Sequence, residues 1–293
     1  MPAFYHKDFV SGKEINDNPF IFTCHYCSSP LSYVDIIDQW DISNEQILQG
    51  FYNTIRIYKE LHSLEDCYLN LRLDHKTEEL TLESCKICGW WRIIKTICVP
   101  AEEWQIWDIR FGCVGTLKNL DLKNINIPVE EVRNFLAAEY DKRNIINPKI
   151  YENVVASVFK SHGYNVIVTG YTHDGGIDVI LENGIEQIGV QVKRSINAIE
   201  VEQIRSFIGA LILGKYRKGI YVTTSSFRKG GVKTVQNLNQ INKMSIELIN
   251  AERFYDALEI AQVRDDRIEN LFHSVTKIPS LNYYDFDTPY NSL

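Results

Sequence analysis

The chain has 293 residues, of which 45% are hydrophobic and 24% are charged, and its formal net charge is -7. The length predicts about two domains, and the composition is that of an ordinary globular protein. No apolar run approaches the roughly 20 residues that a membrane span needs, and the N-terminus lacks the basic and apolar segments of a signal peptide. We therefore expect a cytoplasmic protein with no membrane partner.

Charge is distributed unevenly along the chain. Residues 145–262 contain thirteen Lys or Arg and eleven Asp or Glu, a balance of +2, so the remaining residues carry -9. Local charge decides the binding of a polyanion more than net charge does. The distribution permits nucleic-acid binding by the C-terminal half and does not demonstrate it.

Composition and motifs divide the chain into four segments. An α+β domain whose two cysteine pairs indicate a zinc ribbon comes first, followed by a helical connector, a mixed α/β domain and a tail. Their predicted bounds are 1–115, 116–146, 147–262 and 263–293.

Two C-x-x-C pairs in the first segment account for four of the seven cysteines. They are Cys24, Cys27, Cys85 and Cys88. Two such knuckles make a closed tetrahedral Zn²⁺ site, and four sulfur ligands leave no open position, so we expect a structural ion. The spacer of 57 residues exceeds the usual ~15–20 and must hold an insertion, with a helix around Glu45–Leu61. The alternative is two unrelated cysteine pairs in a core.

Two tryptophans follow the second knuckle directly, in the segment Trp90-Trp91-Arg92. Exposed aromatic side chains stack on nucleic-acid bases, so this segment could help residues 21–115 to read a target. The alternative is that both tryptophans are buried beside the ribbon.

The connector and the second domain show clear helix signals. Pro128 opens a predicted helix over Val129–Lys142, and Asn147-Pro148 begins another, with Asn as the N-cap and Pro at the first helical position. Gly163 ends this second helix. The elements predicted after it are strands Asn165–Thr169, Gly176–Glu182 and Ile185–Lys193, helix Val201–Leu213, strand Gly219–Thr224, helix Lys233–Leu238, strand Ile246–Ile249 and helix Ala251–Ala261. This order predicts a mixed α/β domain with an antiparallel hairpin at its centre.

The hairpin turn sets which residues face each other. A two-residue Asn183-Gly184 turn pairs Glu182 with Ile185, which places Asp178 opposite Gly189. Gly189 would then leave open space across from the carboxylate. The alternate side chains of both strands are apolar and should pack on the core.

The polar face of the hairpin carries a plausible catalytic set. Asp178, Gln191 and Lys193 share this face, and a divalent cation such as Mg²⁺ prefers oxygen ligands. We expect Asp178, Gln191 and the carbonyl of Val192 to bind it, and Lys193 to stabilise developing charge during phosphodiester hydrolysis. Glu152 could turn a second carboxylate toward the site. On spacing alone this pattern is weak, because Asp178 could be a turn residue and the other two the solvated side of a strand.

The stretch YENVVASVFKSHGYNVIVTGYTHDGGIDVILENGIEQIGVQVKR resembles the catalytic domain of the Mrr-type restriction endonucleases, which belong to the PD-(D/E)XK nuclease superfamily. The motifs D-G-G-I-D-V and V-Q-V-K-R carry the resemblance. It continues through EQIRSFIGAL, GIYVTTSSF and IELINAERFYDAL, and it covers roughly 148–262. It implies a restriction-endonuclease-like mixed-sheet fold and an active-site set of Glu152, Asp178, Gln191 and Lys193.

Basic residues flank the strand predicted over Gly219–Thr224. They could contact DNA phosphates, and the alternative is a solvated basic surface. They are Lys215, Arg217, Lys218, Arg228, Lys229 and Lys233. Arg194, beside the expected catalytic lysine, is the candidate contact near the scissile bond.

These features predict a Mg²⁺-dependent DNA endonuclease with a structural Zn²⁺, acting in restriction or anti-phage defence as the resemblance implies. The alternative is a non-cleaving module that keeps the fold and binds DNA or a partner. A zinc-dependent hydrolase is disfavoured, because the cysteines saturate the metal and no H-E-x-x-H motif is present. Cutting two strands with one site per chain suggests a homodimer, and a partner protein of a defence system could gate the activity.

Overall fold

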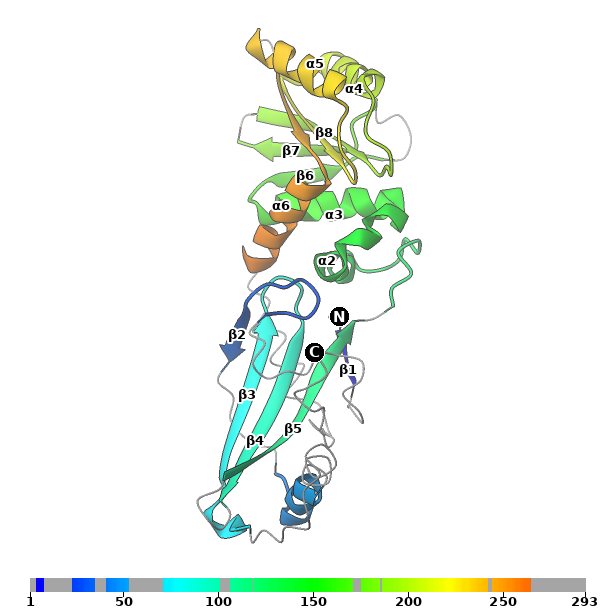
Figure 1. The fold of residues 1–293 in the computed structure, drawn as a ribbon. Coiled ribbons are helices and arrows are strands. Elements are labelled where there is room, and N and C mark those ends of the chain that lie inside the picture. Colours follow the sequence, from blue (N-terminus) through cyan, green and yellow to red (C-terminus); the bar gives the residue numbers. More distant parts are fainter. Residues whose placement is uncertain are drawn as a thin grey trace. The chain divides into compact units, whose positions relative to one another are not determined.

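The computed structural model describes residues 4–7, 23–34, 41–52, 71–100, 106–117, 119–170, 175–184, 186–241 and 244–264 (Figure 1). They fall into two compact units, an N-terminal unit within 4–117 and a C-terminal unit within 119–264. None of the helices in these ranges is both long and apolar enough to cross a membrane.

The N-terminal unit is built on a five-stranded antiparallel sheet with the order β1-β5-β4-β3-β2. Its strands are β1 (Phe4–Lys7), β2 (Leu31–Val34), β3 (Thr77–Cys85), β4 (Trp91–Pro100) and β5 (Ile106–Leu117), with a short 3-10 helix η1 (Leu73–His75) before β3. The second cysteine knuckle forms the turn between β3 and β4, so the hairpin itself presents two of the four thiols.

A helix over 44–52 supplies one wall of the core of this unit. Its Ile47 and Phe51 pack with Ile97 and Val99 of β4 and with Phe111 of β5. The helix predicted around Glu45–Leu61 is thus confirmed over its first half, and the remainder lies outside the described residues.

The aromatic segment after the second knuckle is buried. Trp90 and Trp91 are 2% and 3% exposed, and the indole N–H of Trp90 donates to the carbonyl of Gly115 at 2.9 Å. Arg92 is also buried and is ion-paired with Glu83. The alternative, that both tryptophans are buried, is therefore confirmed, and base stacking by them is wrong as a prediction.

The C-terminal unit is a mixed α/β domain. Its five-stranded sheet has the order β10-β9-β8-β7-β6, in which β6, β7 and β8 are antiparallel and β8, β9 and β10 are parallel. The elements are α2 (Val129–Ala138), η3 (Tyr140–Ile145), α3 (Pro148–Ser161), β6 (Asn165–Val168), β7 (Val179–Asn183), β8 (Glu186–Lys193), α4 (Val201–Leu213), β9 (Lys218–Thr223), α5 (Lys229–Gln240), β10 (Ser245–Ile249) and α6 (Ala251–Arg264). The predicted mixed sheet with a hairpin at its centre is confirmed.

Helices cover both faces of this sheet. Figure 1 shows α3 and α6 on one face and α4 and α5 on the other. Helix α3 begins as the sequence predicts, with Asn147 as N-cap accepting from the N–H of Lys149 at 2.9 Å. Its buried stripe then packs against β6, β7 and β8. The stripe consists of Ile150, Tyr151, Val154, Val155 and Val158.

The predicted connector belongs to the C-terminal unit, because α2 packs on α3 and α6. Helix α2 ends at Ala138, not at Lys142 as predicted. The chain instead tightens into η3, where the ring of Tyr140 stacks on Tyr255 at 4.6 Å and its hydroxyl donates to the carbonyl of Ala251. This tertiary packing overrides the local helix signal.

The hairpin register differs from the prediction by two residues. The structure pairs Glu182 with Gln187, not with Ile185, so Gly189 lies opposite Ile180 and not opposite Asp178. Because the shift is an even number of residues, every side chain keeps its predicted face.

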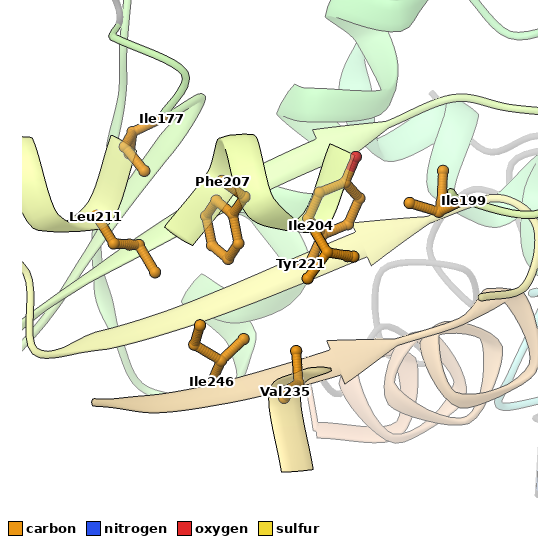
Figure 2. Packing of buried hydrophobic residues seen from close by; sticks show 8 residues of the cluster. All are labelled: Ile177, Ile199, Ile204, Phe207, Leu211, Tyr221, Val235 and Ile246. Atoms are coloured by element: carbon orange, nitrogen blue, oxygen red, sulfur yellow. The ribbon is translucent and has the colours of Figure 1, made fainter. Parts of the chain in front are cut away.

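Gly189 also has a different role from the one predicted. It is a ladder neighbour of Gly219, and both lie beneath Leu211 of α4. A Cβ atom would meet the δ-carbons of Leu211 at 2.7 Å on Gly189 and at 2.3 Å on Gly219. The two glycines therefore let α4 approach the sheet. Leu211 lies in the core shown in Figure 2, with Ile177 and Phe207 beside it.

Candidate active site

Asp178 is fixed immediately before the first residue of β7. Its carboxylate Oδ2 accepts from the backbone N–H of Val192 at 2.7 Å, and its own N–H donates to the carbonyl of Val190 at 2.9 Å. Its carbonyl accepts from the N–H of Thr169 at 3.0 Å. The half-buried carboxylate is thus tied to the end of β8, and the backbone of Asp178 is held by β8 and by the residue that follows β6.

The end of β8 presents the other predicted residues. Gln191 and Lys193 pair with Tyr221 and Thr223 of β9, and their side chains lie on the face opposite the buried Val192. Gln191 is half-buried and Lys193 is exposed. Within the described ranges neither side chain makes a hydrogen bond or ion pair, so both remain available to a ligand.

The donor set suits a hard divalent cation. In a strand the N–H and C=O of one residue point to the same side, so the carbonyl of Val192 is directed toward Asp178 like its N–H. The carboxylate of Asp178, the amide of Gln191 and this carbonyl offer three oxygen ligands, as Mg²⁺ prefers.

Glu152 is held in an ion pair on α3. Its carboxylate accepts from the ammonium of Lys149 at 2.7 Å, and the two side chains are only 17% and 18% exposed. The same ammonium donates to the carbonyl of Thr169 at 3.1 Å. Since Thr169 also binds the carbonyl of Asp178, a continuous set of contacts joins Glu152 to Asp178. Sequence reasoning missed Lys149 and Thr169.

Tyr221 is a further residue that sequence reasoning missed. Burial, with the charge of Asp178 as a second cause, raises the pKa of Tyr221 to about 12. Edge-to-face contacts with Phe207 and Phe227, at 5.4 and 5.8 Å between ring centroids, fix its ring. At neutral pH it therefore places an uncharged phenol close to the carboxylate.

Hydroxyl groups tie together the two chain segments that leave the sheet at this edge. The hydroxyl of Thr223 donates to the carbonyl of Lys193 at 3.0 Å. Beyond it, the hydroxyl of Thr224 accepts from the N–H of Ser195 and donates to its carbonyl, both at 2.8 Å. The backbone after Lys193 is thereby held in one place.

Helix η3 braces the same edge. Arg143 donates from Nε to the carbonyl of Thr224 at 3.0 Å and lies over the ring of Tyr140. Arg194 donates from Nη1 to the carbonyl of Asn144 at 3.0 Å. Arg194, which was predicted to lie near the scissile bond, thus uses one of its guanidinium nitrogens to bind η3.

The structure separates the predicted DNA-binding residues into two groups. Lys215, Arg217 and Lys218 come at or before the start of β9, whereas Arg228 and Lys229 follow its end. At about 3.3 Å per residue, six residues of strand put roughly 20 Å between the two groups. Only the second group lies at the edge that carries Lys193.

Two of these basic residues are already paired with carboxylates. Lys218 is ion-paired with Glu186, and Arg228 with Glu200 at 3.2 Å. Lys229 and Lys233 are exposed on α5, where they line an open hollow of about 770 Å³. Among the basic residues that follow β9, these two lysines have no carboxylate partner within the described ranges.

The four cysteines of the N-terminal unit come together as predicted. Their sulfur atoms all lie within 4.8 Å of one another, and the closest pairs, Cys24 with Cys88 and Cys27 with Cys85, are 3.4 Å apart. Three of the four residues are buried. This cluster fits a closed tetrahedral zinc site.

The two knuckles close by different residues. Gly89 takes a φ of 80° after the second pair, and Ser28 takes a φ of 59° after the first. The neighbouring Cys27 sulfur raises the pKa of the Cys24 thiol, and the same contact lowers the pKa of Cys27. Cysteine binds zinc as thiolate, so a bound cation would replace the thiol protons.

Comparison with known proteins relates the C-terminal unit to a protein family. Residues 143–258 match the family model of the Mrr catalytic domain, described as a restriction endonuclease. A type IV methyl-directed restriction enzyme, EcoKMrr of Escherichia coli strain K12, is 32% identical over 108 residues. This region is a Mrr-type restriction endonuclease catalytic domain. The alignment with the E. coli enzyme covers 34% of this chain and 36% of that enzyme. The N-terminal unit, within 4–117, lies entirely before the matched residues.

Two solved structures share lower similarity with the chain. The MspJI restriction endonuclease in complex with a 27-mer oligonucleotide has a TM-score of 0.29 and 17% identity, covering 58% of this chain and 40% of that one. A protein of unknown function has a TM-score of 0.30 and 14% identity, covering 36% and 58%. At these values the likeness supports no residue-level comparison.

Proposed function

We propose that the chain is a divalent-cation-dependent DNA endonuclease that acts in the cytoplasm in restriction of foreign DNA. The observation that carries the proposal is the meeting of Asp178, Gln191 and Lys193 at one strand end within the Mrr-type domain. Glu152 is the fourth member of the proposed set, joined to the others through Lys149.

Each side chain has a role that its surroundings support. The N–H of Val192 orients Asp178, whose carboxylate would hold a cation together with the amide oxygen of Gln191, and Mg²⁺ is the expected ion. A bound divalent cation would supply positive charge to the scissile phosphate and promote ionisation of the attacking water. The free ammonium of Lys193 stabilises negative charge that develops on the phosphate oxygens.

DNA would approach the edge at which β8 and β9 end. Lys229 is the first residue of α5, which starts near this edge, and Lys233 follows about one turn later on the same helix. Both are exposed and could contact phosphates. One active site per chain cuts one strand at a time, so cleavage of both strands would need a second copy of the chain. A homodimer on DNA is therefore part of the proposal, and a gating partner protein remains a prediction.

The N-terminal unit is proposed to select the target. Since Trp90 and Trp91 are buried, this role would have to rest on other surfaces of residues 21–115. Removing these residues should abolish sequence or modification preference and leave cleavage intact. Unchanged preference would contradict the role.

The direct test is cleavage of plasmid and phage DNA with and without Mg²⁺ after chelation. Methylated and unmethylated DNA should both be used, because the related E. coli enzyme is methyl-directed. We expect cation-dependent cutting by the wild type and a loss of at least roughly 100-fold in Asp178→Asn, since this removes a ligand charge.

Asp256→Asn is the matched control, because this aspartate is exposed on α6 and lies outside the proposed site. It should cut like the wild type. DNA binding without cleavage by the wild type on every substrate would instead favour the non-cleaving module.

A further inference from the structure

Lys149 occupies an unusual place on α3. It lies in the first turn of the helix, which contains no acidic residue. The helix dipole favours acidic side chains in this turn and disfavours basic ones. The dipole alone therefore disfavours this lysine, and its i,i+3 ion pair with Glu152 offsets that cost by only a small amount. A residue that breaks a local rule beside a proposed active site is a candidate for a role there.

Two contacts of the Lys149 ammonium lead toward the proposed active site. Its ammonium is 2.7 Å from Glu152 Oε2 and 3.1 Å from the carbonyl of Thr169. The N–H of Thr169 donates to the carbonyl of Asp178 at 3.0 Å, and its hydroxyl lies 2.8 Å from the same oxygen. One ammonium thus contacts the carboxylate of Glu152 directly and reaches the backbone of Asp178 through a single residue, Thr169.

The pair is too enclosed to be an ordinary surface ion pair. With both side chains less than a fifth exposed, solvent screens the interaction poorly. The ammonium therefore restrains the Glu152 side chain and offsets its negative charge.

We propose that Lys149 is a positioning residue of the nuclease site, which holds Glu152 in place and limits the negative charge that DNA meets there. This inference rests on the proposed function, since it concerns the same site. Lys149 touches neither the phosphate nor the cation in this account. It acts through Glu152 and through the strand end that carries Asp178.

The test compares Lys149→Met, which keeps the length of the side chain and removes its charge, with Lys149→Arg, which keeps the charge. Mn²⁺ binding to the zinc-loaded protein without DNA is measured by calorimetry, and plasmid cleavage is measured under saturating cation. Lys160→Met is the matched control, because Lys160 is exposed in the last turn of the same helix.

Lys149→Met should bind Mn²⁺ roughly tenfold more tightly, because one positive charge near the ligands is gone. It should nevertheless cleave roughly 10–100-fold more slowly, as is usual when a group that orients a ligand is lost. Lys149→Arg should keep wild-type Mn²⁺ affinity. A merely structural lysine would lower affinity and rate together, along with the melting temperature.

The proposal would be overturned if Lys149→Met cleaved at the wild-type rate, or if its Mn²⁺ affinity did not rise. Failure of the proposed function gives a different result, in which the wild type itself binds no Mn²⁺ and cuts no DNA. The wild-type measurements therefore separate the two failures.

Discussion

The two candidate metal centres of this chain differ in their donor atoms and in their exposure to solvent. The cysteine cluster offers four soft sulfur donors, three of them on buried residues, packed within 4.8 Å. The centre at Asp178 offers hard oxygen donors at the open ends of two strands, next to the exposed Lys193. A closed sulfur centre holds a fold together, whereas an open oxygen centre leaves room for a phosphate.

Removal of zinc should have the largest effect on folding, and it should affect only the N-terminal unit. Structural zinc contributes on the order of 10 kcal/mol to the folding of small domains. We expect Cys27→Ser combined with Cys85→Ser to abolish zinc binding and unfold the N-terminal unit. Hydrogen exchange should then show β3 and β4 unprotected while α3 and β8 keep their protection.

Cys98→Ala is the control for this experiment, since Cys98 lies on β4 outside the cluster. It should retain one zinc per chain. Zinc content that stays at one in the double variant would show that the cluster is not the site.

A smaller effect concerns the packing behind the open centre. A Cβ on Gly219 would lie 2.3 Å from Leu211, so Gly219→Ala should lower the free energy of unfolding by about 1–3 kcal/mol. Chemical denaturation measures it. Gly209 lies on α4, the helix of Leu211, and a Cβ added there meets nothing within 4 Å. Gly209→Ala should therefore leave the free energy of unfolding unchanged or raise it by up to about 1 kcal/mol.

Leu211→Ala provides a check on the cause. If the clash with Leu211 is responsible, the double variant Gly219→Ala/Leu211→Ala should be less destabilised than the sum of the single changes. Strict additivity would mean that the glycine serves another purpose.

The smallest expected effect separates the two groups of basic residues. Lys229→Ala should weaken DNA binding and reduce the slope of log affinity against log salt by about 1, because one phosphate contact is lost. Lys215→Ala, about one strand length away, should leave both unchanged. Equal effects of the two changes, measured by fluorescence anisotropy, would contradict an approach of DNA to the edge that carries Lys193.

Local signals in the sequence predicted much of the fold. Asn147-Pro148 marks the start of α3, and the apolar run Val201–Leu213 gives the bounds of α4 as the structure has them. The Asn183-Gly184 turn predicted the hairpin and the correct faces, but its register was wrong by two residues.

What the sequence could not supply depends on contacts between distant segments. The sequence around Gly189 did not indicate that Leu211 would pack on it. Nor did the sequence around Trp90 indicate that its indole would bind the carbonyl of Gly115 on β5. The grouping of Asp178, Gln191 and Lys193 stays a prediction as a catalytic set. Lys149 could have been noticed as a basic residue in the first turn of a helix, although its partners could not.

The most direct test of the account is the rate of plasmid cleavage by Lys193→Met at saturating DNA and Mg²⁺, beside Lys160→Met. The account predicts a loss of at least roughly 100-fold in Lys193→Met with DNA binding retained, because the ammonium acts on charge that develops during the reaction. It predicts wild-type cleavage by Lys160→Met. Cleavage by Lys193→Met at the wild-type rate would contradict the assignment of this strand end as the active site.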